Sequence, residues 1–356
     1  MSCDFPLIKL VGTAFERGKT YGSAAADKVG VSIKMYSDLF RDFAGLQWED
    51  AKKRAARFER DIQEYFPDAL EEMRGIAAGA GVSYEDILAL NCRSELMFAL
   101  PDGCSTMALV PEATADGKTI LAQTWDWLMG CRPGTVILEV CQPPRPTILT
   151  VSEAGMVGGK GLNSSGIGVC LNAMSVGRGQ LGVPLHIMYR GILNSVTITD
   201  AIDAMILHKR AGAGTFTIGS GPAGIVACCE YTPDNFDILM SEGEILCHTN
   251  HYLSPLFLKE DTLKNTLADS FIRYNRLRRQ AKALCGRLDV QNIWQVFRDH
   301  ANYPDSICSH EDPKDAPTRR FCTVYGAAMD LNQKTLWVTN GNPCEGPAYP
   351  FHLLPQ

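Results

Sequence analysis

The residue best suited to covalent chemistry in this sequence is a cysteine that directly follows a glycine, Cys104 in the run DGCST at positions 102–106. A thiol needs a base to become a good nucleophile, and no histidine lies near it in the sequence. If the peptide bond between Gly103 and Cys104 were cut, the new α-amino group, with an ordinary pKa of about 8, could take the thiol proton. A glycine before the thiol also leaves room for attack on the preceding carbonyl carbon.

The other cysteines form no recognisable framework. There are 13 in all, an odd number, and none stands in a Cys-x-x-Cys pair. Disulfide scaffolds and zinc sites usually show even counts or close ligand pairs. His248 and His251 stand three apart, but no third ligand follows at a known spacing, so a polar turn is favoured there. The sequence therefore predicts reduced, mostly buried thiols and no metal site.

One glycine-rich run, GSGPAG at 219–224, matches the GxGxxG pattern of dinucleotide-binding proteins. That pattern requires a helix directly after the glycines, whose N-terminus meets the pyrophosphate. Here the following residues, IVACCEY at 225–231, are typical of a strand, and a proline stands inside the run. A hairpin loop is predicted instead, without nucleotide binding.

Composition excludes several classes of protein. The chain has 356 residues, 46% of them hydrophobic, and 34 basic against 40 acidic residues give a net charge of −6. A nucleic-acid surface is disfavoured, because phosphate contacts need clustered Lys and Arg. No apolar run reaches the roughly 20 residues that span a bilayer. The N-terminus lacks the pattern of a secretory signal, so a cytoplasmic protein without membrane or nucleic-acid partners is expected.

The elements expected around Cys104 are helices before it and strands after it. Helical periodicity is seen at 14–43, at 48–65, from Pro67 to about 79, and from 84 to about 100. Strand patterns follow at 104–110, 119–127, 135–141, 147–151, 168–172, 215–219, 225–231, 238–240, 321–330 and 334–340, with helices at 184–195, 200–209, 263–285 and 290–300. Separate blocks of helices and antiparallel-looking strands predict a layered α+β protein that forms one composite domain over residues 1–356.

The chain resembles the acyl-coenzyme A:6-aminopenicillanate acyltransferase (isopenicillin N acyltransferase) family of N-terminal nucleophile hydrolases from Gly12 to about Asp330. The segments that carry the resemblance are GTAFERG (12–18), RGIAAGA (74–80), LNCRSE (90–95), DGCST (102–106), QTWD (123–126), EAG (153–155), NSSG (163–166), GVP (182–184), HTNH (248–251) and NYPDSIC (302–308). Together, in this order, they are specific. The resemblance implies a four-layer αββα sandwich whose precursor cleaves itself into a helical part, 1–103, and a second part, 104–356, which stay associated.

The resemblance also implies roles for four residues. The nucleophile is Cys104, the aspartate of the Trp-Asp pair is Asp126, the oxyanion-type asparagine is Asn250, and a catalytic arginine near the C-terminus is Arg320. A hairpin turning at 116–117 would bring strand 124–127 beside 104–107, so Asp126 is expected close to the thiol. Without the resemblance, a surface turn for Asn250 and a surface charge for Arg320 would be preferred.

Three departures from the family pattern concern the substrate. Where fungal penicillin acyltransferases read Ser-Ile-Cys-Arg, this chain ends the motif in Ser309, and the missing arginine is one associated with the substrate carboxylate. That carboxylate could instead be met by Arg319. A family serine is replaced by Thr232, which keeps a hydroxyl. The C-terminal LPQ is not a peroxisomal address.

The expected function is that of a self-processing cysteine acyltransferase. It would form an acyl-Cys104 thioester from an acyl-CoA-like donor and pass the acyl group to a small-molecule amine, with no bound cofactor. An amidohydrolase that cleaves an N-acyl or β-alanyl amide is the runner-up, because the outcome depends on whether amine or water attacks the intermediate. A non-catalytic binding relative is the remaining alternative.

Overall fold

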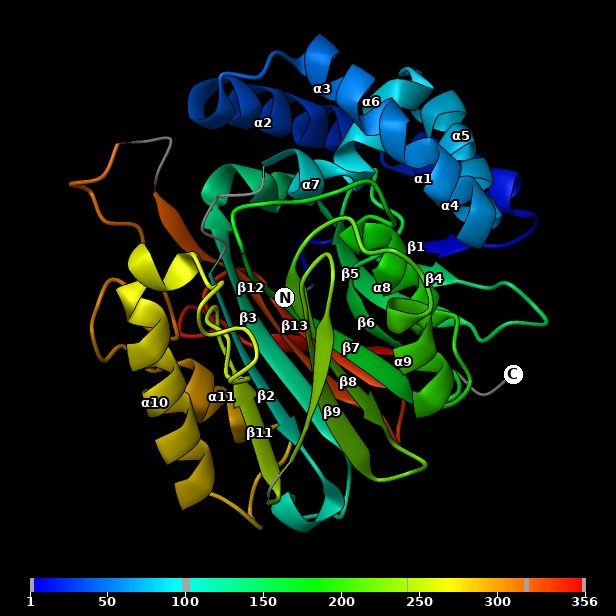
Figure 1. Ribbon diagram of the computed structural model, residues 1–356. Helices are drawn as coiled ribbons and strands as arrows, with labels where there is room; N and C mark the ends of the chain where they lie inside the picture. Colours follow the sequence, from blue (N-terminus) through cyan, green and yellow to red (C-terminus); the bar gives the residue numbers. More distant parts are fainter. Residues whose placement is uncertain (1–2, 98–102, 242, 317–319, 354–356) are drawn as a thin grey trace.

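Two β-sheets face each other at the centre of the computed structural model, which describes residues 3–97, 103–241, 243–316 and 320–353 (Figure 1). The larger sheet has eight strands in the order β1-β4-β5-β6-β7-β8-β9-β10. Its strands are β1 (Leu7–Leu10), β4 (Thr135–Val140), β5 (Ile148–Glu153), β6 (Lys160–Asn163), β7 (Ile167–Ala173), β8 (Gly214–Ser220), β9 (Ile225–Tyr231) and β10 (Phe236–Met240). All neighbours are antiparallel except β1 and β4, which run parallel.

The smaller sheet has six antiparallel strands in the order β11-β2-β3-β12-β13-β14. They are β2 (Gly103–Leu109), β3 (Ile120–Leu128), β11 (Ile245–His248), β12 (Phe321–Asp330), β13 (Thr335–Thr339) and β14 (Ala348–His352). Cys104 therefore lies near the start of an interior strand of this sheet.

Helices cover the outer faces of both sheets. The smaller sheet is covered by α10 (Ala268–Ala283) and α11 (Ile293–Phe297), and the larger by α8 (Leu185–Leu193) and α9 (Ile198–Ile206) (Figure 1). The remaining helices gather at one end of the sheets: α1 (Ala14–Ala24), α2 (Ala26–Ala44), α3 (Trp48–Ala55), α4 (Glu59–Tyr65), α5 (Pro67–Ala80), α6 (Tyr84–Asn91) and α7 (Arg93–Met97). The predicted αββα sandwich is confirmed. Residues before Gly103 are not only helical, since they also supply the edge strand β1.

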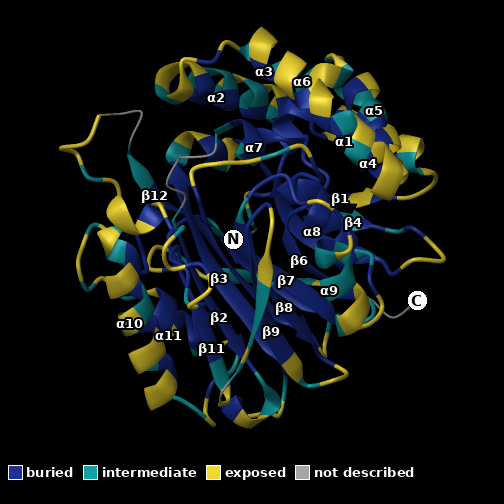
Figure 2. Ribbon diagram, viewed as in Figure 1, coloured by how far each residue is buried: buried dark blue, intermediate teal, exposed yellow. Residues whose placement is uncertain are grey.

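The central strands between the two helical layers, such as β2 and β3, are buried on both faces. All nine residues of β3 and all but one of β2 are buried, and Figure 2 shows the strands as the dark centre of the molecule. A strand with no solvent face does not need polar residues at alternate positions. Polar residues inside these strands, such as Asp126, therefore need partners within the protein.

One predicted helix, 14–43, is divided at Ala25 into α1 and α2. No glycine or proline marks the break. The helix before the break, α1, packs closely on α5, where a Cβ atom on Gly18 or Gly22 would come within 2.1 Å of a backbone oxygen of α5. Such an approach fixes the direction of α1 independently of α2, and only the packed structure reveals it.

The predicted turns and most predicted strands are found. The loop between β2 and β3 makes the expected hairpin, and GSGPAG forms the turn between β8 and β9. Four strands were missed, namely β1, β6, β11 and β14, each of four or five residues. Strands this short hold too few residues for an alternating pattern to stand out. Among the described residues, no helix has the length and apolar character needed to cross a membrane.

Candidate active site

Cys104 is the second residue of β2, and its side chain is fully buried. In the β2–β3 hairpin it pairs with Trp125, and Gly103 pairs with Asp126. The closeness of Asp126 to the Gly103–Cys104 peptide, expected from the turn at 116–117, is confirmed by this register. The peptide bond expected to break therefore lies directly opposite the predicted catalytic aspartate.

Position 103 has space only for glycine. A Cβ atom built there would lie 2.8 Å from the Asp126 Cβ, closer than two carbon atoms can approach without displacement. On its other side, Asp126 faces β12, where Thr323 is its register partner and donates from Oγ1 to Asp126 Oδ1 (2.6 Å). The carboxyl group is thus held between the neighbouring strands.

Asn250 lies two residues beyond β11, the strand that pairs with β2 on the side away from β3. Its Oδ1 accepts a hydrogen bond from the backbone N–H of Cys104 (2.8 Å). Its Nδ2 donates to the carbonyl oxygen of Ala173 (3.1 Å), at the end of β7. The asparagine predicted to stabilise an oxyanion therefore holds the backbone nitrogen atom of Cys104.

Arg273 is a site residue that the sequence did not indicate. It lies on α10 with only 2% of its surface exposed. Its Nη1 donates to the carbonyl oxygen of Cys104 (2.8 Å) and its Nη2 to Asn250 Oδ1 (3.1 Å). Asp269, one turn earlier, accepts from its Nε (2.8 Å) and provides the balancing charge. In the sequence, an Asp and an Arg four residues apart are typical of an exposed helix face, so the pattern gave no sign that Arg273 is buried in the site.

The Cys104 carbonyl oxygen receives a second hydrogen bond, from Asn172 Nδ2 on β7 (3.2 Å). Since β7 belongs to the larger sheet and β2 to the smaller, Cys104 is held from both layers. Its backbone nitrogen and oxygen are both fixed before any substrate arrives.

A buried carboxylate holds the loop that carries Asn250. Glu230 of β9 accepts from the backbone N–H groups of Leu253 (2.7 Å) and Ser254 (2.9 Å), and it meets His248 Nε2 at 2.7 Å. Both Glu230 and His248 are fully buried. Charge-assisted hydrogen bonds of this kind are stronger than neutral ones, so the loop has a firm anchor.

The two histidines weighed as a metal pair serve this loop instead. His248 binds Glu230 and the Thr249 carbonyl oxygen, while His251 Nδ1 lies 2.8 Å from Ser270 Oγ. Burial, together with the charges of His248 and Arg273, lowers the pKa of His251 to about 4. This is the polar turn that the sequence favoured.

Several other thiols are buried in the core. Burial raises the pKa of the Cys170, Cys229 and Cys247 thiols to about 12. A thiol with so high a pKa is protonated at neutral pH and is a poor nucleophile. These cysteines behave as the small hydrophobic core residues that were expected.

A cleft adjoins the site on the side of Asn250. Ala173, the partner of Asn250 Nδ2, lines it, and so does Trp127, the residue after Asp126. Its walls are polar and apolar in about equal parts, and they include the ionisable residues Arg93, Glu95 and Arg178 and the apolar residues Met97, Met174 and Leu185. Glu95 is 3% exposed, and burial raises the pKa of its carboxyl to about 7. Its Oε1 accepts from Leu185 N–H, whereas its Oε2 has no hydrogen-bond partner.

The other predicted site residues fall in different places. Arg320 donates to the carbonyl oxygens of Asp315 and Pro313 in the loop before β12, and the guanidinium that contacts Cys104 belongs to Arg273. The Thr232 hydroxyl accepts from Asn235 N–H within the turn after β9. The catalytic role of Arg320 and the substrate role of Thr232 remain predictions without support from these contacts. Arg319 lies outside the described residues.

Ser309 contacts the site through a hydrogen bond from its backbone. It is buried, and its N–H donates to Thr323 Oγ1 (3.0 Å), the same hydroxyl that donates to Asp126. The segment that departs from the family pattern is therefore linked to Asp126 through one side chain. This position agrees with a role near the substrate, which remains a prediction.

Comparisons with known proteins agree with this geometry. The chain is 29% identical over 340 residues to the acyl-coenzyme A:6-aminopenicillanic-acid-acyltransferase 40 kDa form of Emericella nidulans, covering 93% of this chain and 91% of that protein. It is 22% identical to Protein dcd1A of Dictyostelium discoideum over 64% of this chain and 58% of that one.

Among solved structures, a variant of the conjugated bile acid hydrolase from Clostridium perfringens superposes with a TM-score of 0.50 at 10% identity. The match covers 70% of this chain and 97% of that one, and shows the shared N-terminal nucleophile hydrolase fold. The sequence model of the family described as Acyl-coenzyme A:6-aminopenicillanic acid acyl-transferase matches residues 113–345, well over half of the chain. The protein is therefore an enzyme that belongs to the acyl-coenzyme A:6-aminopenicillanic acid acyl-transferase family.

Proposed function

We propose that this enzyme cleaves its own chain between Gly103 and Cys104 and then transfers acyl groups from an acyl thioester to an amine through an acyl-Cys104 intermediate. The observation that carries the proposal is that the backbone of Cys104 is held at both polar atoms. Asn250 accepts a hydrogen bond from its nitrogen, and Arg273 donates one to its carbonyl oxygen. Holding both backbone atoms fixes the Cα atom of a buried residue beside the preceding carbonyl group, which favours attack by its side chain there.

The first step is an N-to-S acyl shift. The Cys104 thiol attacks the carbonyl carbon of Gly103, the C–N bond breaks, and the nitrogen takes the proton that the thiol loses. Water then hydrolyses the resulting thioester, which gives a Gly103 carboxylate, a free thiol and a free α-amino group on Cys104. The absence of a side chain at Gly103 supports this step, because a Cβ there would press on Asp126.

The released amine becomes the base for later turnovers. Its nitrogen is the atom that donates to Asn250 Oδ1, so the amine stays anchored beside its own thiol. It takes the thiol proton, the thiolate attacks the carbonyl carbon of the donor thioester, and the donor thiol leaves with a proton. An amine then attacks acyl-Cys104, the amide departs, and the thiol is restored.

The cleft beside Asn250 is the proposed substrate site. Its apolar residues, such as Met97, Met174 and Leu185, suit an acyl chain, while the Arg178 guanidinium and the Glu95 carboxyl group can hydrogen-bond to polar groups. Since the family's arginine is replaced by Ser309, we propose an amine acceptor without the carboxylate of 6-aminopenicillanate. A panel of amines with one acyl-CoA tests this: kcat/KM should be higher for a neutral amine than for 6-aminopenicillanate, and the reverse order would refute the acceptor assignment.

Self-cleavage is tested by denaturing electrophoresis and intact-mass measurement of four purified proteins, the native chain and three variants. The native chain should give two fragments that meet between residues 103 and 104, and Cys104→Ala should stay whole. Gly103→Ala should cleave slowly or not at all, while the matched control Gly30→Ala, where a Cβ meets no atom within 4 Å, should cleave normally. An active native enzyme that remains one intact chain would refute the cleavage step.

Transfer and hydrolysis are separated by the product. With an acyl-CoA donor, added amine should convert most of the acyl group to amide, and acyl-Cys104 should be visible by mass when amine is withheld. A product made only of free acid at saturating amine would make the enzyme an amidohydrolase or thioesterase while leaving the cleavage result intact.

A further inference from the structure

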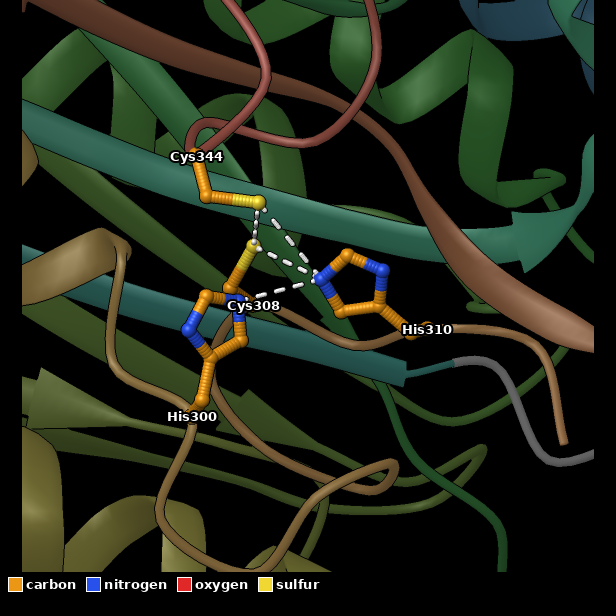
Figure 3. Close-up of side chains that lie close together, drawn as sticks. All are labelled: His300, Cys308, His310 and Cys344. Atoms are coloured by element: carbon orange, nitrogen blue, oxygen red, sulfur yellow. Dashed lines mark hydrogen bonds between the residues drawn. The ribbon is translucent and has the colours of Figure 1, made fainter.

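Four metal-binding side chains converge beside the active site on segments that the mechanism does not use. His300 follows α11, Cys308 and His310 lie in the next loop, and Cys344 lies in the loop between β13 and β14. Figure 3 shows the four side chains pointing toward one another from these three segments. One ligand atom from each residue lies within 4.8 Å of all the others.

Four of the six distances between the ligand atoms match the edges of a tetrahedron around one ion. The two Sγ atoms are 3.5 Å apart, His310 Nε2 lies 3.7 Å from Cys308 Sγ and 3.5 Å from Cys344 Sγ, and the two Nε2 atoms are 3.1 Å apart. With Zn–S of about 2.3 Å and Zn–N of about 2.0 Å, a tetrahedral site has edges of about 3.8 Å, 3.5 Å and 3.3 Å for S–S, S–N and N–N pairs. Each measured edge lies within about 0.3 Å of these values.

Hydrogen bonding alone does not account for this cluster. His310 Nε2 holds either one hydrogen or one lone pair, directed along a single line. It nevertheless approaches three ligand atoms from His300, Cys308 and Cys344 at 3.1–3.7 Å. A cation at the common centre binds all four atoms at once, which a single hydrogen cannot do.

The neighbouring side chains also suit a metal–thiolate centre. Asn342 Nδ2 lies 3.5 Å from Cys308 Sγ and donates to the Ser309 carbonyl oxygen (2.6 Å). An N–H group directed at a ligating sulfur, tied in turn to the ligand loop, is the outer contact that orients metal ligands. Two thiolates balance the charge of one divalent ion, so the bound site is neutral.

We propose that His300, Cys308, His310 and Cys344 bind one zinc ion. The two cysteine thiols release two protons to solvent on binding, and both histidines bind as neutral imidazoles through Nε2. Four protein ligands leave no open position for water or substrate, so the ion is structural rather than catalytic. The sequence pattern predicts no metal site here. The four ligands follow one another at spacings of 8, 2 and 34 residues, and the two cysteines do not form a close pair.

The position of the proposed zinc site suggests a structural role for the ion next to Asp126. Ser309 lies between two of the ligands, and its N–H donates to Thr323, whose hydroxyl donates to Asp126. Zinc would join the loops around residues 300, 309 and 344 and so fix the peptide that supports Asp126. This inference concerns the residues next to the catalytic group and does not depend on Cys104 being the nucleophile.

The test is the zinc content of the whole protein, expressed without a histidine tag and purified with a reducing agent. Inductively coupled plasma mass spectrometry should find about one zinc ion per chain. His300→Gln and Cys344→Ser should each lose most of it. Cys285→Ser and His352→Gln, which change the same residue types outside the cluster, should keep it.

Cobalt substitution of the native protein gives a second measurement that needs no variant to fold. Bound Co²⁺ should produce a thiolate-to-cobalt charge-transfer band and the intense visible bands of a tetrahedral site, and zinc should abolish them. Native protein with no more metal than an unrelated control, zinc retained by both ligand variants, or a Cys308–Cys344 disulfide present under reducing conditions would each overturn the proposal.

Discussion

The backbone of Cys104 is held more firmly than its position in a strand requires. Strand pairing already binds β2 to β3 and β11, and Asn250, Arg273 and Asn172 add side-chain hydrogen bonds to its nitrogen and oxygen atoms. Because Asn250 Oδ1 accepts from both Cys104 N–H and Arg273 Nη2, the amide oxygen of Asn250, and not its nitrogen, faces Cys104. The acceptor and donor halves of this side chain can therefore be tested separately.

Asn250→Asp keeps an oxygen toward Cys104 N–H and Arg273 but removes the Nδ2 donor. We expect self-cleavage to proceed, whereas acyl transfer should fall about 10²–10³-fold if Nδ2 donates to the oxyanion. Fragment formation on gels and kcat on a common substrate give the two readouts. Asn250→Ala should impair both, and an Asn250→Asp enzyme with native kcat would limit the residue to positioning.

Glu95 gives a pH-dependent prediction, because burial raises the pKa of its carboxyl from 4.5 to about 7. The folded protein holds this proton more tightly than the unfolded one, so the stabilisation is full below pH 4.5 and is lost as the pH rises through 7. Relative to Glu95→Gln, the free energy of unfolding should fall by about 2–3 kcal/mol between pH 5 and pH 8.

Urea unfolding of both proteins in the Cys104→Ala background, where each remains a single chain, measures this difference. Glu85→Gln, an exposed acidic residue on the neighbouring helix, serves as the control and should show no such change. A gap between native and Glu95→Gln proteins that does not vary with pH would show that the carboxyl is not protonated in the folded state.

At the scale of elements, the site lies where the two sheets are joined. Glu230 belongs to β9 of the larger sheet, and the loop it anchors leaves β11 of the smaller one. Arg273 reaches the same place from α10, which covers the smaller sheet. Asn250 therefore depends on contacts from both sheets, and loosening this junction should misplace it.

Glu230→Gln keeps the size of the side chain but removes its charge and one acceptor oxygen. At least one of its partners, His248, Leu253 N–H or Ser254 N–H, then loses its acceptor, at a cost of about 1–3 kcal/mol for each buried donor. We expect a lower melting temperature and slower self-cleavage. Glu244→Gln, at an exposed position, is the matched control, and native cleavage in Glu230→Gln would show that the loop does not need this anchor.

At the scale of the whole molecule, the part before Gly103 is bound to the rest by buried contacts. Glu72 of α5 accepts from Arg17 of α1 and from both Nη atoms of Arg190 on α8 (2.8 Å each). Tyr36 donates to Glu153 (2.7 Å), and β1 pairs with β4. These contacts do not involve the 103–104 bond, which supports the proposal that the cleaved chains stay associated.

Glu72→Gln should weaken this association. It leaves two buried guanidinium groups without their counter-charge, which typically costs about 3–5 kcal/mol. After cleavage, the two chains should separate at a lower urea concentration than in the native protein, as followed by size-exclusion chromatography. Glu71→Gln, which breaks only the exposed pair with Arg74, should change the free energy of unfolding by less than about 0.5 kcal/mol.

Much of the fold followed from local sequence. The turn at 116–117 and the strands on either side of it determine the hairpin register, so the meeting of Gly103, Cys104 and Asp126 could be predicted from residues close in the chain. The hydrophobic periodicity and the turn residues also predicted most strands and the layered α+β class. Where local signals were weak, in strands of four or five residues and at the break in helix 14–43, the prediction failed.

The remainder of the site could not be predicted, because its members are far apart in the chain and look ordinary locally. Arg273 stands 169 residues from Cys104, and its pairing with Asp269 is that of a surface helix. The resemblance pointed to Arg320, and only the packing of the chain showed that the guanidinium in contact with Cys104 is that of Arg273. The sequence by itself determined that the Cys104 thiol follows Gly103 and that the hairpin places Asp126 opposite this pair. The packing of the two sheets and α10 decided which distant polar groups surround it, since burial and long-range contacts exist only in the folded chain.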